Sequence, residues 1–474
     1  MAVTSAQNDP VISAILKASY EYRRKTMIES DGRPLADPDN DDIDRDEDRT
    51  EKVTFSETVS YDLSRAVLMD DHETFDKLWL WASANMQRKN ISRIFNPQTK
   101  GWESLEPSKR DHLFAWRFLP SVGGKDGGVL NNCDPAADAD QDIAAALLMA
   151  DKKWGSSGKI SYRTEALAIL NDIWGKETRI INGKRVLIAG DTQIYTKDPF
   201  TGAPTTGINI SYFRPTYYKK LFAEADLDHN WDSMVAPCYE IIRKAERAVL
   251  HDQSQAPVEG KVNIVPDWIA LDPKGEVRDH GWSKGDHGMS DYYAGGDAFR
   301  TLIWMALQAK LDPTDAEARA YCDCSSLKSD FSPCQFYKGE MNKNGTIYSG
   351  YDINGSVRWR SETLQTHGVY MAYLWASGDI EDAKKLYGLL QSNYNNDGYW
   401  GKNPAEYYGQ NWVWFSLYLV NEFGGFQQVD IAPNEGVKPG LNEEKKPEPK
   451  EESKPEPAVE PPQKAKKIEW IIEN

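Results

Sequence analysis

Several carboxylate residues precede apolar, helix-forming segments, where they could carry out acid and base chemistry. Glu57 and Asp297 each stand at the start of such a segment, and Asp138, Asp140 and Asp142 open a third one. Two carboxyl groups can hydrolyse an acetal if one is protonated and donates to the leaving oxygen while the other is ionised and activates water. Spacing along the chain does not give the distance between Glu57 and Asp297, so it cannot distinguish inversion from retention of configuration.

Each of these acids also has a purely structural explanation. Carboxylates in the first turn of a helix cap its free N–H groups and suit the positive end of its dipole. The D-x-D-x-D run of residues 138–142 also resembles the opening of a calcium loop, but such a loop needs Gly at its sixth position and Glu at its twelfth, counted from Asp138. This chain has Ile143 and Met149 there, so a calcium site is excluded.

The composition limits the classes of partner. Asp and Glu together number 73 against 56 Lys and Arg, and the net charge of -17 would repel nucleic acid and favours a neutral substrate. No apolar run approaches 18 residues, so no membrane span is predicted. The seven His residues form no H-E-x-x-H motif and the cysteines no C-x-x-C motif, so neither a metal nor a cofactor is expected.

The cysteines and the N-terminus bear on export from the cell. Five cysteines are an odd number and define no disulfide framework, although Cys322 or Cys324 could pair with Cys334 in an exported protein. The opening MAVTSAQNDP has no basic segment followed by an apolar one, so a signal peptide is either absent or already removed.

Helical spacing of apolar residues recurs in pairs along the chain. Helices are expected within residues 10–22, 53–71, 75–86, 137–154, 163–174, 211–225, 231–250, 295–310, 362–376, 380–394 and 407–423. Asn182 and Gly183 predict a tight turn between two short strands, and residues 261–272 alternate like a strand. These patterns predict an all-α fold, an (α/α)6 barrel of six inner and six outer helices with short β-hairpin insertions. A superhelix of repeats is the alternative, but the sequence has no fixed repeat period.

Two segments cannot contribute to a core. Residues 37–51 are strongly acidic and predict a solvated loop. From residue 434 the chain is rich in Pro, Glu and Lys, which predicts a disordered linker or tail over residues 434–474. Residues 1–433 then form the catalytic domain, and the tail could attach it to a further module or surface.

Three segments, in order along the chain, resemble the motifs of glycoside hydrolase family 8. Residues 55–79, FSETVSYDLSRAVLMDDHETFDKLW, resemble the family's S-E-G-x-x-Y-G segment. Residues 136–154, AADADQDIAAALLMADKKW, resemble its signature A-[ST]-D-[AG]-D-x-x-[IM]-A, and residues 295–307, GGDAFRTLIWMAL, resemble its Y-D-A-x-R-T segment.

The resemblance implies an (α/α)6 barrel and an inverting endo-acting hydrolase of β-1,4-linked glucans. Glu57 would be the general acid, Asp297 the general base, and Asp138 the carboxylate that holds the distorted sugar and helps to position water. Arg300 would keep Asp297 ionised. The A-D-A-D form of the signature favours cellulose-type or mixed-linkage β-glucan over xylan, and retention of Asp297 disfavours chitosan. We expect a secreted or extracellular enzyme.

Aromatic side chains could stack on the faces of sugar rings, since the chain has 16 Trp and 23 Tyr, although each could equally pack in the core. The candidate substrate contacts are Trp116, Asp140, Tyr212, Tyr217, Tyr293, Arg300, Tyr408 and Trp412. Asn209 and Arg214 could bind sugar hydroxyls or cap a helix.

The chain departs from the family pattern at four positions. Thr58 and Asp62 replace glycines of the first motif, Ala137 replaces Ser or Thr, and Gly296 replaces the Tyr before the base. Either Tyr293 or Tyr292 would have to supply that hydroxyl, or the enzyme would be slower. Three alternatives therefore stay open: a xylanase or chitosanase on the same fold, a retaining or lyase reaction, and a catalytically weak carbohydrate-binding protein.

Overall fold

The structure is a computed structural model that describes residues 8–36, 53–120, 122, 127–156, 158–191, 195–252, 254–280, 292–325 and 330–426. The predictions for the acidic loop 37–51 and for the tail 434–474 lie outside these residues. No helix in the described part of the chain is both long and apolar enough to cross a membrane.

Most of the inner helices are recognised by burial on nearly all of their faces, and the helix over residues 217–225 is half-buried. The inner helices are α2 (Ser56–Leu68), α4 (Ala137–Trp154), the π-helical Tyr217–Phe222 with α6 (Ala223–Ala225), α8 (Arg300–Leu311), α11 (Leu364–Ala376) and α13 (Tyr407–Glu422). Small residues bring them close together. A Cβ on Gly368 of α11, for example, would lie 2.9 Å from the backbone of Val413 on α13, so only glycine permits this approach.

The outer helices bury a single stripe, as amphipathic helices on a surface do. They are α1 (Pro10–Thr26), α3 (His72–Asn85), α5 (Tyr162–Lys176), α7 (Val235–Ala245), α9 (Ala316–Tyr321) and α12 (Ile380–Asn393), and α10 (Cys334–Asn344) is an additional helix.

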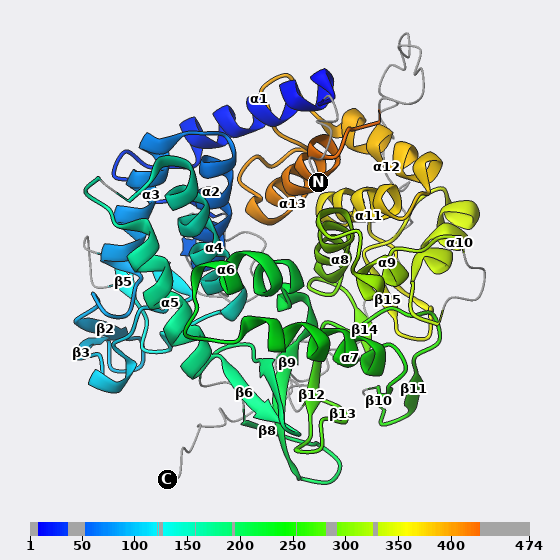
Figure 1. Ribbon diagram of the computed structural model, residues 1–474, viewed down its shortest axis with the longest axis horizontal. Helices are drawn as coiled ribbons and strands as arrows, with labels where there is room; N and C mark the ends of the chain where they lie inside the picture. The colour runs from blue at the N-terminus through cyan, green and yellow to red at the C-terminus, as the bar shows by residue number, and fades with distance from the viewer. Residues whose placement is uncertain are drawn as a thin grey trace, which may run out of the picture. The chain divides into compact units, whose positions relative to one another are not determined.

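Neighbouring inner helices contact one another in chain order, with the Tyr217 ring against Trp304 of α8, and α13 returns to contact α2, which closes the ring. Inner helices are paired with outer ones, as in α2 with α3, α4 with α5, and α11 with α12. Figure 1 shows this ring, from blue α2 through green α8 to orange α13. The predicted (α/α)6 barrel is confirmed for the described residues.

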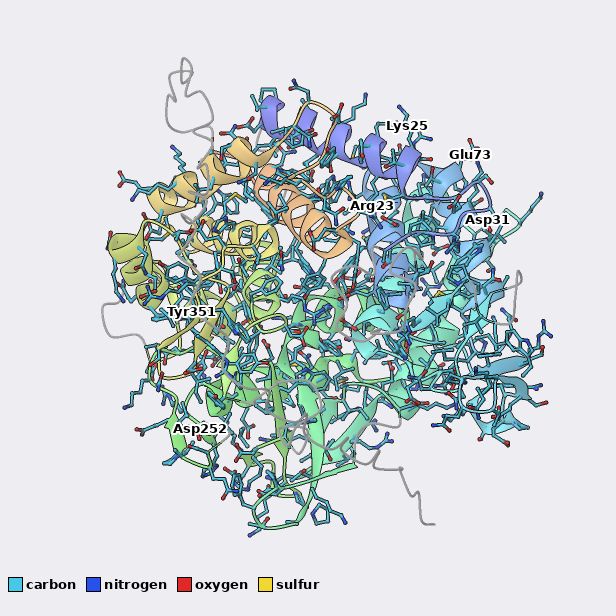
Figure 2. The ribbon with its side chains drawn as sticks, turned by 180° about the vertical axis from the view of Figure 1, so that it is seen from behind. Arg23, Lys25, Asp31, Glu73, Asp252 and Tyr351 are labelled. Carbon is cyan, nitrogen blue, oxygen red and sulfur yellow. A yellow bond between two sulfur atoms is a disulfide. The ribbon has the colours of Figure 1, made fainter. Side chains whose placement is uncertain are left out.

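Helix α1 packs against α13 and is joined to α2 by a buried ion pair. Arg23, labelled in Figure 2, donates from Nη2 to Asp62 Oδ2 on α2 at 2.8 Å, and both side chains are buried. Arg65 of α2 donates to Asn411 of α13 at 3.0 Å. Asp62, one of the departures from the family pattern, therefore has a structural role in this chain.

Short antiparallel strands occupy the connections. They are β1 (Thr54–Phe55), β2 (Arg93–Asn96), β3 (Gly101–Ser104), β4 (Arg117–Leu119), β5 (Gly128–Val129), β6 (Thr178–Ile181), β7 (Lys184–Leu187), β10 (Val249–His251), β11 (Pro257–Glu259), β14 (Tyr293–Ala294), β15 (Gly350–Asp352) and β16 (Val357–Trp359). The predicted hairpin is the pair β6–β7. Its turn residues Asn182 and Gly183 have φ of 49° and 72°, as a tight turn of this kind requires.

Among the described residues, three sheets are larger than the predicted hairpin insertions: the three-stranded sheets β1-β4-β5 and β14-β15-β16, and one of four strands. Strands β8 (Tyr195–Lys197), β9 (Pro204–Asn209), β12 (Trp268–Leu271) and β13 (Val277–Arg278) form a four-stranded antiparallel sheet in the order β13-β12-β9-β8. These strands lie together at the lower edge of Figure 1. Pairing between β9 and β12 spans some sixty residues, so periodicity along the chain could not show it. The expected strand within 261–272 is β12, at its C-terminal end.

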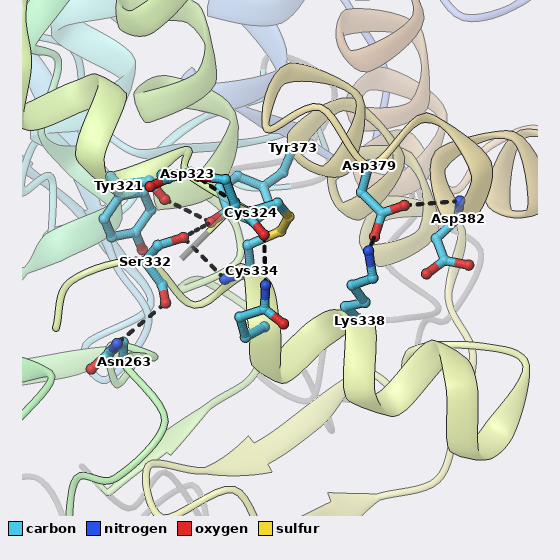
Figure 3. Close-up of a disulfide and its surroundings, with 12 residues drawn as sticks. Asn263, Tyr321, Asp323, Cys324, Ser332, Cys334, Lys338, Tyr373, Asp379 and Asp382 are labelled. Carbon is cyan, nitrogen blue, oxygen red and sulfur yellow. Dashed lines mark hydrogen bonds and ion pairs between the residues drawn. A yellow bond between two sulfur atoms is a disulfide. The ribbon is translucent and has the colours of Figure 1, made fainter. Parts of the chain in front are cut away.

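A disulfide joins Cys324 to Cys334, between the end of α9 and the start of α10. Figure 3 shows it beside Ser332 and Tyr373, whose hydroxyl donates to the backbone carbonyl of Tyr321 at 2.7 Å. Cys322, the alternative partner, is a buried free thiol.

Replacing both Cys324 and Cys334 with Ser is expected to lower the free energy of unfolding by about 2–3 kcal/mol, because the bond closes a short loop and restricts the unfolded chain. Thermal denaturation measures the effect. Reductant should lower the melting temperature of the wild-type protein and leave the double variant unchanged. Equal melting temperatures for the wild-type protein and the double variant, each with and without reductant, would contradict the expected contribution of this bond.

Candidate active site

The N-terminal ends of the inner helices surround a cavity of about 470 Å³. Glu57 and Asp138 are the second residues of α2 and α4, Arg300 is the first residue of α8, and Tyr407 is the first of α13. Unpaired N–H groups give helix N-termini a positive potential that stabilises anions. The barrel thus brings acids from distant parts of the sequence into one cleft of a size that suits ligand binding.

Arg300 connects the three acids. Its Nη1 donates to Glu57 Oε1 at 2.8 Å and to Asp138 Oδ2 at 2.9 Å, and its Nη2 donates to Asp297 Oδ1 at 2.7 Å. Burial lowers the pKa of this guanidinium, but Tyr408 and the three carboxylates raise it well above its ordinary value. One permanent cation therefore holds all three carboxyl groups.

Glu57 has the environment of a proton donor. Burial raises its pKa, Arg300 lowers it, Asp138 raises it, and the hydroxyls of Tyr61 and Tyr407 lower it, so that the pKa lies at about 7. The Tyr61 hydroxyl donates to Glu57 Oε1 at 2.6 Å and the Tyr407 hydroxyl to Oε2 at 3.0 Å. Near neutral pH a large fraction of Glu57 is protonated, as a general acid must be.

Replacing Tyr407 with Phe is expected to move the alkaline limb of the kcat/KM profile to higher pH. The Tyr407 hydroxyl stabilises the ionised form of Glu57, so its loss raises the pKa of Glu57 and keeps the acid protonated at higher pH. The matched control is Tyr22→Phe on outer helix α1. A limb that moves to lower pH in Tyr407→Phe would contradict this account.

Asp297 has the environment of a proton acceptor. Its Oδ1 binds Arg300, and its Oδ2 accepts from Asn209 Nδ2 at 2.9 Å and from Trp268 Nε1 at 3.1 Å. Asn209 and Trp268 face each other across β9 and β12, so the unpredicted sheet orients this carboxylate. A carboxylate accepts about four hydrogen bonds, and the three donors leave one position for water.

Asp138 lies buried in the cleft wall. Its Oδ1 accepts from the backbone N–H of Ala139 at 2.9 Å, and its Oδ2 accepts from Arg300. Burial raises its pKa, and the charges of Arg300 and Arg214 act in the opposite direction. The side chain is therefore fixed before any ligand enters.

Four of the expected aromatic contacts line the cavity, namely Trp116, Tyr212, Tyr293 and Tyr408. The Trp116 ring stacks on Phe55 with centroids 5.8 Å apart. The Tyr408 hydroxyl donates to the carbonyl of Gly296 at 2.8 Å, directly before Asp297. A Cβ on Gly296 would meet no atom within 4 Å, so the missing side chain leaves open space beside Asp297.

Tyr292 and Tyr293 were both candidates to supply the hydroxyl that Gly296 lacks. Tyr293 lines the cavity. The Tyr292 hydroxyl instead accepts from Arg358 Nη1 at 2.6 Å. Tyr293 therefore remains the candidate for this role.

Three expected substrate contacts lie away from this cavity. Asp140 is fully buried and accepts from the backbone N–H of Phe114 at 2.9 Å, because a residue two positions after Asp138 points to the opposite side of a helix. Tyr217 and Trp412 line a second cavity, of about 540 Å³, among residues deeper in the inner helices. Trp412 is one helical turn beyond Tyr408, so it shares the same face but lies inside the barrel wall. We therefore assign no substrate contact to these three residues.

Two other polar residues also have structural partners. Arg214 is fully buried and donates from Nε to Asp142 Oδ1 at 3.0 Å, so it binds a helix rather than a ligand. The Asn209 side-chain oxygen caps the next turn by accepting from the Ser211 N–H at 3.0 Å, while its amide reaches Asp297.

Asp267, Gln365 and Glu406 also line the cavity and were not expected. For Asp267, the sequence offered one signal of a site residue: it is an acid that directly precedes β12, a short strand of apolar residues. Among the described residues, no group of three or more His, Cys, Asp or Glu side chains has an arrangement that could hold a metal ion.

Comparison with known proteins identifies the family. The model of Glycosyl hydrolases family 8 matches residues 6–324, more than half of the chain. The chain belongs to this family. As a family 8 glycoside hydrolase, it is 26% identical over 408 residues to Endoglucanase A of Acetivibrio thermocellus, covering 84% of this chain and 69% of that relative.

Solved structures share the barrel of this family 8 enzyme. An endo-1,4-D-glucanase from Vibrio fischeri has a TM-score of 0.59 at 17% identity, with 86% of this chain and 97% of that chain covered. A cold-adapted family 8 xylanase has a TM-score of 0.62 at 16% identity, with 88% and 93% covered. At these identities the likeness concerns the fold alone.

Proposed function

We propose that this glycoside hydrolase is an inverting endo-β-1,4-glucanase, with Glu57 as general acid and Asp297 as general base. The observation that carries the proposal is the arrangement around Arg300, which holds a carboxyl group with a pKa of about 7 and a second carboxylate that binds donors on both oxygens. An acid and a base with different environments are what glycoside hydrolysis requires.

In the proposed reaction, Glu57 transfers its proton to the glycosidic oxygen as the bond from that oxygen to the anomeric carbon breaks. A water molecule attacks the anomeric carbon from the opposite face, and Asp297 accepts its proton. The new C–O bond has inverted configuration. Proton exchange with solvent then returns Glu57 to its protonated form and Asp297 to its ionised form.

Arg300 and Asp138 support this reaction through their contacts with the base and beside the acid. Arg300 keeps a positive charge beside Asp297 and stabilises its carboxylate before water arrives. Asp138 shares Nη1 of Arg300 with Glu57, so it lies beside the acid. There its carboxylate holds the distorted sugar and raises the pKa of Glu57. The cavity-lining rings of Trp116, Tyr212, Tyr293 and Tyr408 bind neighbouring sugars.

Chromatographic identification of products from carboxymethylcellulose, barley β-glucan, xylan and chitosan tests the substrate class. We expect oligosaccharides of several lengths from the first two substrates. The relatives with the printed name endoglucanase support this choice. Products from xylan alone would favour the second candidate, a xylanase, an activity that the same fold carries in the cold-adapted family 8 xylanase.

We also propose that the protein is secreted and that residues 434–474 connect the catalytic domain, residues 1–433, to another module or surface. A polymeric glucan is met outside the cell, and the disulfide between Cys324 and Cys334 suits an oxidising compartment. Fractionation of the producing cells would test the location. Recovery of the activity only in the reduced cytoplasm would contradict it.

A further inference from the structure

We propose that Asp267 is a positioning residue that holds the turn carrying the general base, and that it acts through its oxygen atom and not through its charge. This inference rests on the proposed function, since it concerns the base of that reaction. Asp267 has no other role in the mechanism described above.

A single oxygen of Asp267 binds three backbone groups of the turn. Its Oδ1 accepts from the N–H of Gly295 at 2.8 Å, of Asp297 at 3.1 Å and of Ala298 at 2.7 Å. These N–H groups flank and include the base itself. They lie in the turn that leads into α8, whose first N–H groups donate to the carbonyls of Asp297 and Ala298 in that turn. Asp267 thus fixes the backbone of Asp297 and of the turn from which this helix begins.

The contacts around Asp267 leave little freedom for movement. Its own backbone N–H donates to the carbonyl of Tyr293 at 2.9 Å, so the same residue binds both ends of the segment 293–298. A Cβ on Gly295 would lie 3.0 Å from Asp267 Oδ2, 2.6 Å from the Trp359 ring and 2.9 Å from the Tyr293 ring. The side chain is buried in this packing.

Asp267 and its neighbour Trp268 act on the same base in two ways. Asp267 holds the backbone of Asp297, and Trp268 donates to its carboxylate at 3.1 Å. The carboxylate must meet Arg300, Asn209 and Trp268 at the same time, so a displaced turn would break contacts at both oxygens. Misplacement by about 1 Å can cost about 10²-fold in rate.

The electrostatics show why the oxygen and not the charge matters. Burial and the nearby charge of Asp297 raise the pKa of Asp267 to about 7, against the effect of the three backbone N–H groups. Near pH 7 the neutral form of Asp267 is therefore close in free energy to its ionised form in the folded protein. An Asn side chain has the same shape and keeps an oxygen that can accept all three hydrogen bonds.

Steady-state kinetics of Asp267→Ala and Asp267→Asn on a soluble β-glucan tests the proposal. We expect Asp267→Ala to lower kcat by about 10²-fold because the base is misplaced, with KM changed by less than about threefold because the substrate contacts remain. We expect Asp267→Asn to restore kcat to within about threefold of the wild-type value.

Asp272→Ala is the matched control. Asp272 follows the other end of β12, and its Oδ1 accepts from the N–H of Lys274 and of Glu276 at 2.9 Å each, so it holds a different turn in the same way. Its loss should leave kcat unchanged. Thermal melting of all the variants separates lost activity from lost folding.

Each outcome decides between distinct conclusions. Unchanged kcat in folded Asp267→Ala would overturn the proposal, and so would a loss in Asp267→Asn as large as that in Asp267→Ala, because the charge would then be required. If Asp267→Ala does not fold, the Asp267→Asn result decides alone: near-normal kcat supports the proposal and a large loss overturns it. A wild-type protein inactive on every β-glucan would instead refute the proposed function.

Discussion

Replacing Glu57 with Gln is expected to lower kcat on polymeric β-glucan by about 10²–10⁴-fold, the range that a general acid contributes. The amide has the shape of the carboxyl group, and its one oxygen can replace Oε1 as the acceptor for Tyr61 and Arg300. The Tyr407 hydroxyl, which donates to Oε2, can rotate to accept from the amide NH2 group, so the cleft should stay intact. It cannot supply an acidic proton. The matched control is Glu73→Gln on outer helix α3, labelled in Figure 2, where the carboxylate is exposed and binds Lys77.

The nature of the leaving group distinguishes loss of the acid from general damage to the site. A β-cellobioside of 2,4-dinitrophenol leaves without protonation, so Glu57→Gln should hydrolyse it at a rate close to that of the wild-type protein. The polymer, whose leaving alcohol needs a proton, should show the full loss. An equal loss on both substrates would contradict the role of Glu57 as general acid.

Replacing Asp297 with Asn is expected to lower kcat by about 10²–10⁴-fold on both the polymer and the dinitrophenyl substrate. Activation of water is required whatever the leaving group, and an amide cannot accept the proton. The matched control is Asp252→Asn, in an exposed turn labelled in Figure 2, where Asn keeps the oxygen that accepts from Ser254 and Ala256.

The two substitutions together give a pattern that a merely destabilised protein would not show. Glu57→Gln should recover on the activated substrate, whereas Asp297→Asn should not. Recovery of Asp297→Asn on that substrate would contradict its assignment as the base and would indicate that another group activates water.

The barrel could be predicted from the sequence because apolar residues recur at helical spacing in successive pairs of segments, and because some connections carry local signals. The Asn182-Gly183 turn is such a signal, since its backbone conformation depends on those two residues. The four-stranded sheet had no local signal, because Asn209 of β9 and Trp268 of β12 pair only in the folded chain. The short helices α9 and α10 were also not predicted, since few residues define their periodicity.

The acids of the site were found by their positions at helix starts, but which side chains face the cleft depends on rotation and depth along each helix. Asp138 and Asp140 are equivalent in the motif, yet only Asp138 reaches the cavity because residues two apart point to opposite sides of α4. Tyr408 and Trp412 share a face and differ by one turn in depth. Asp267 was missed because its partners are backbone groups.

Proton NMR of the first products from a β-1,4-linked oligosaccharide tests the central claim most directly. If Glu57 protonates the leaving oxygen while Asp297 directs water to the opposite face, the newly formed reducing end must appear first as the α-anomer and convert to the β-anomer only by mutarotation. Initial formation of the β-anomer would show retention and would contradict the proposed roles of these two residues.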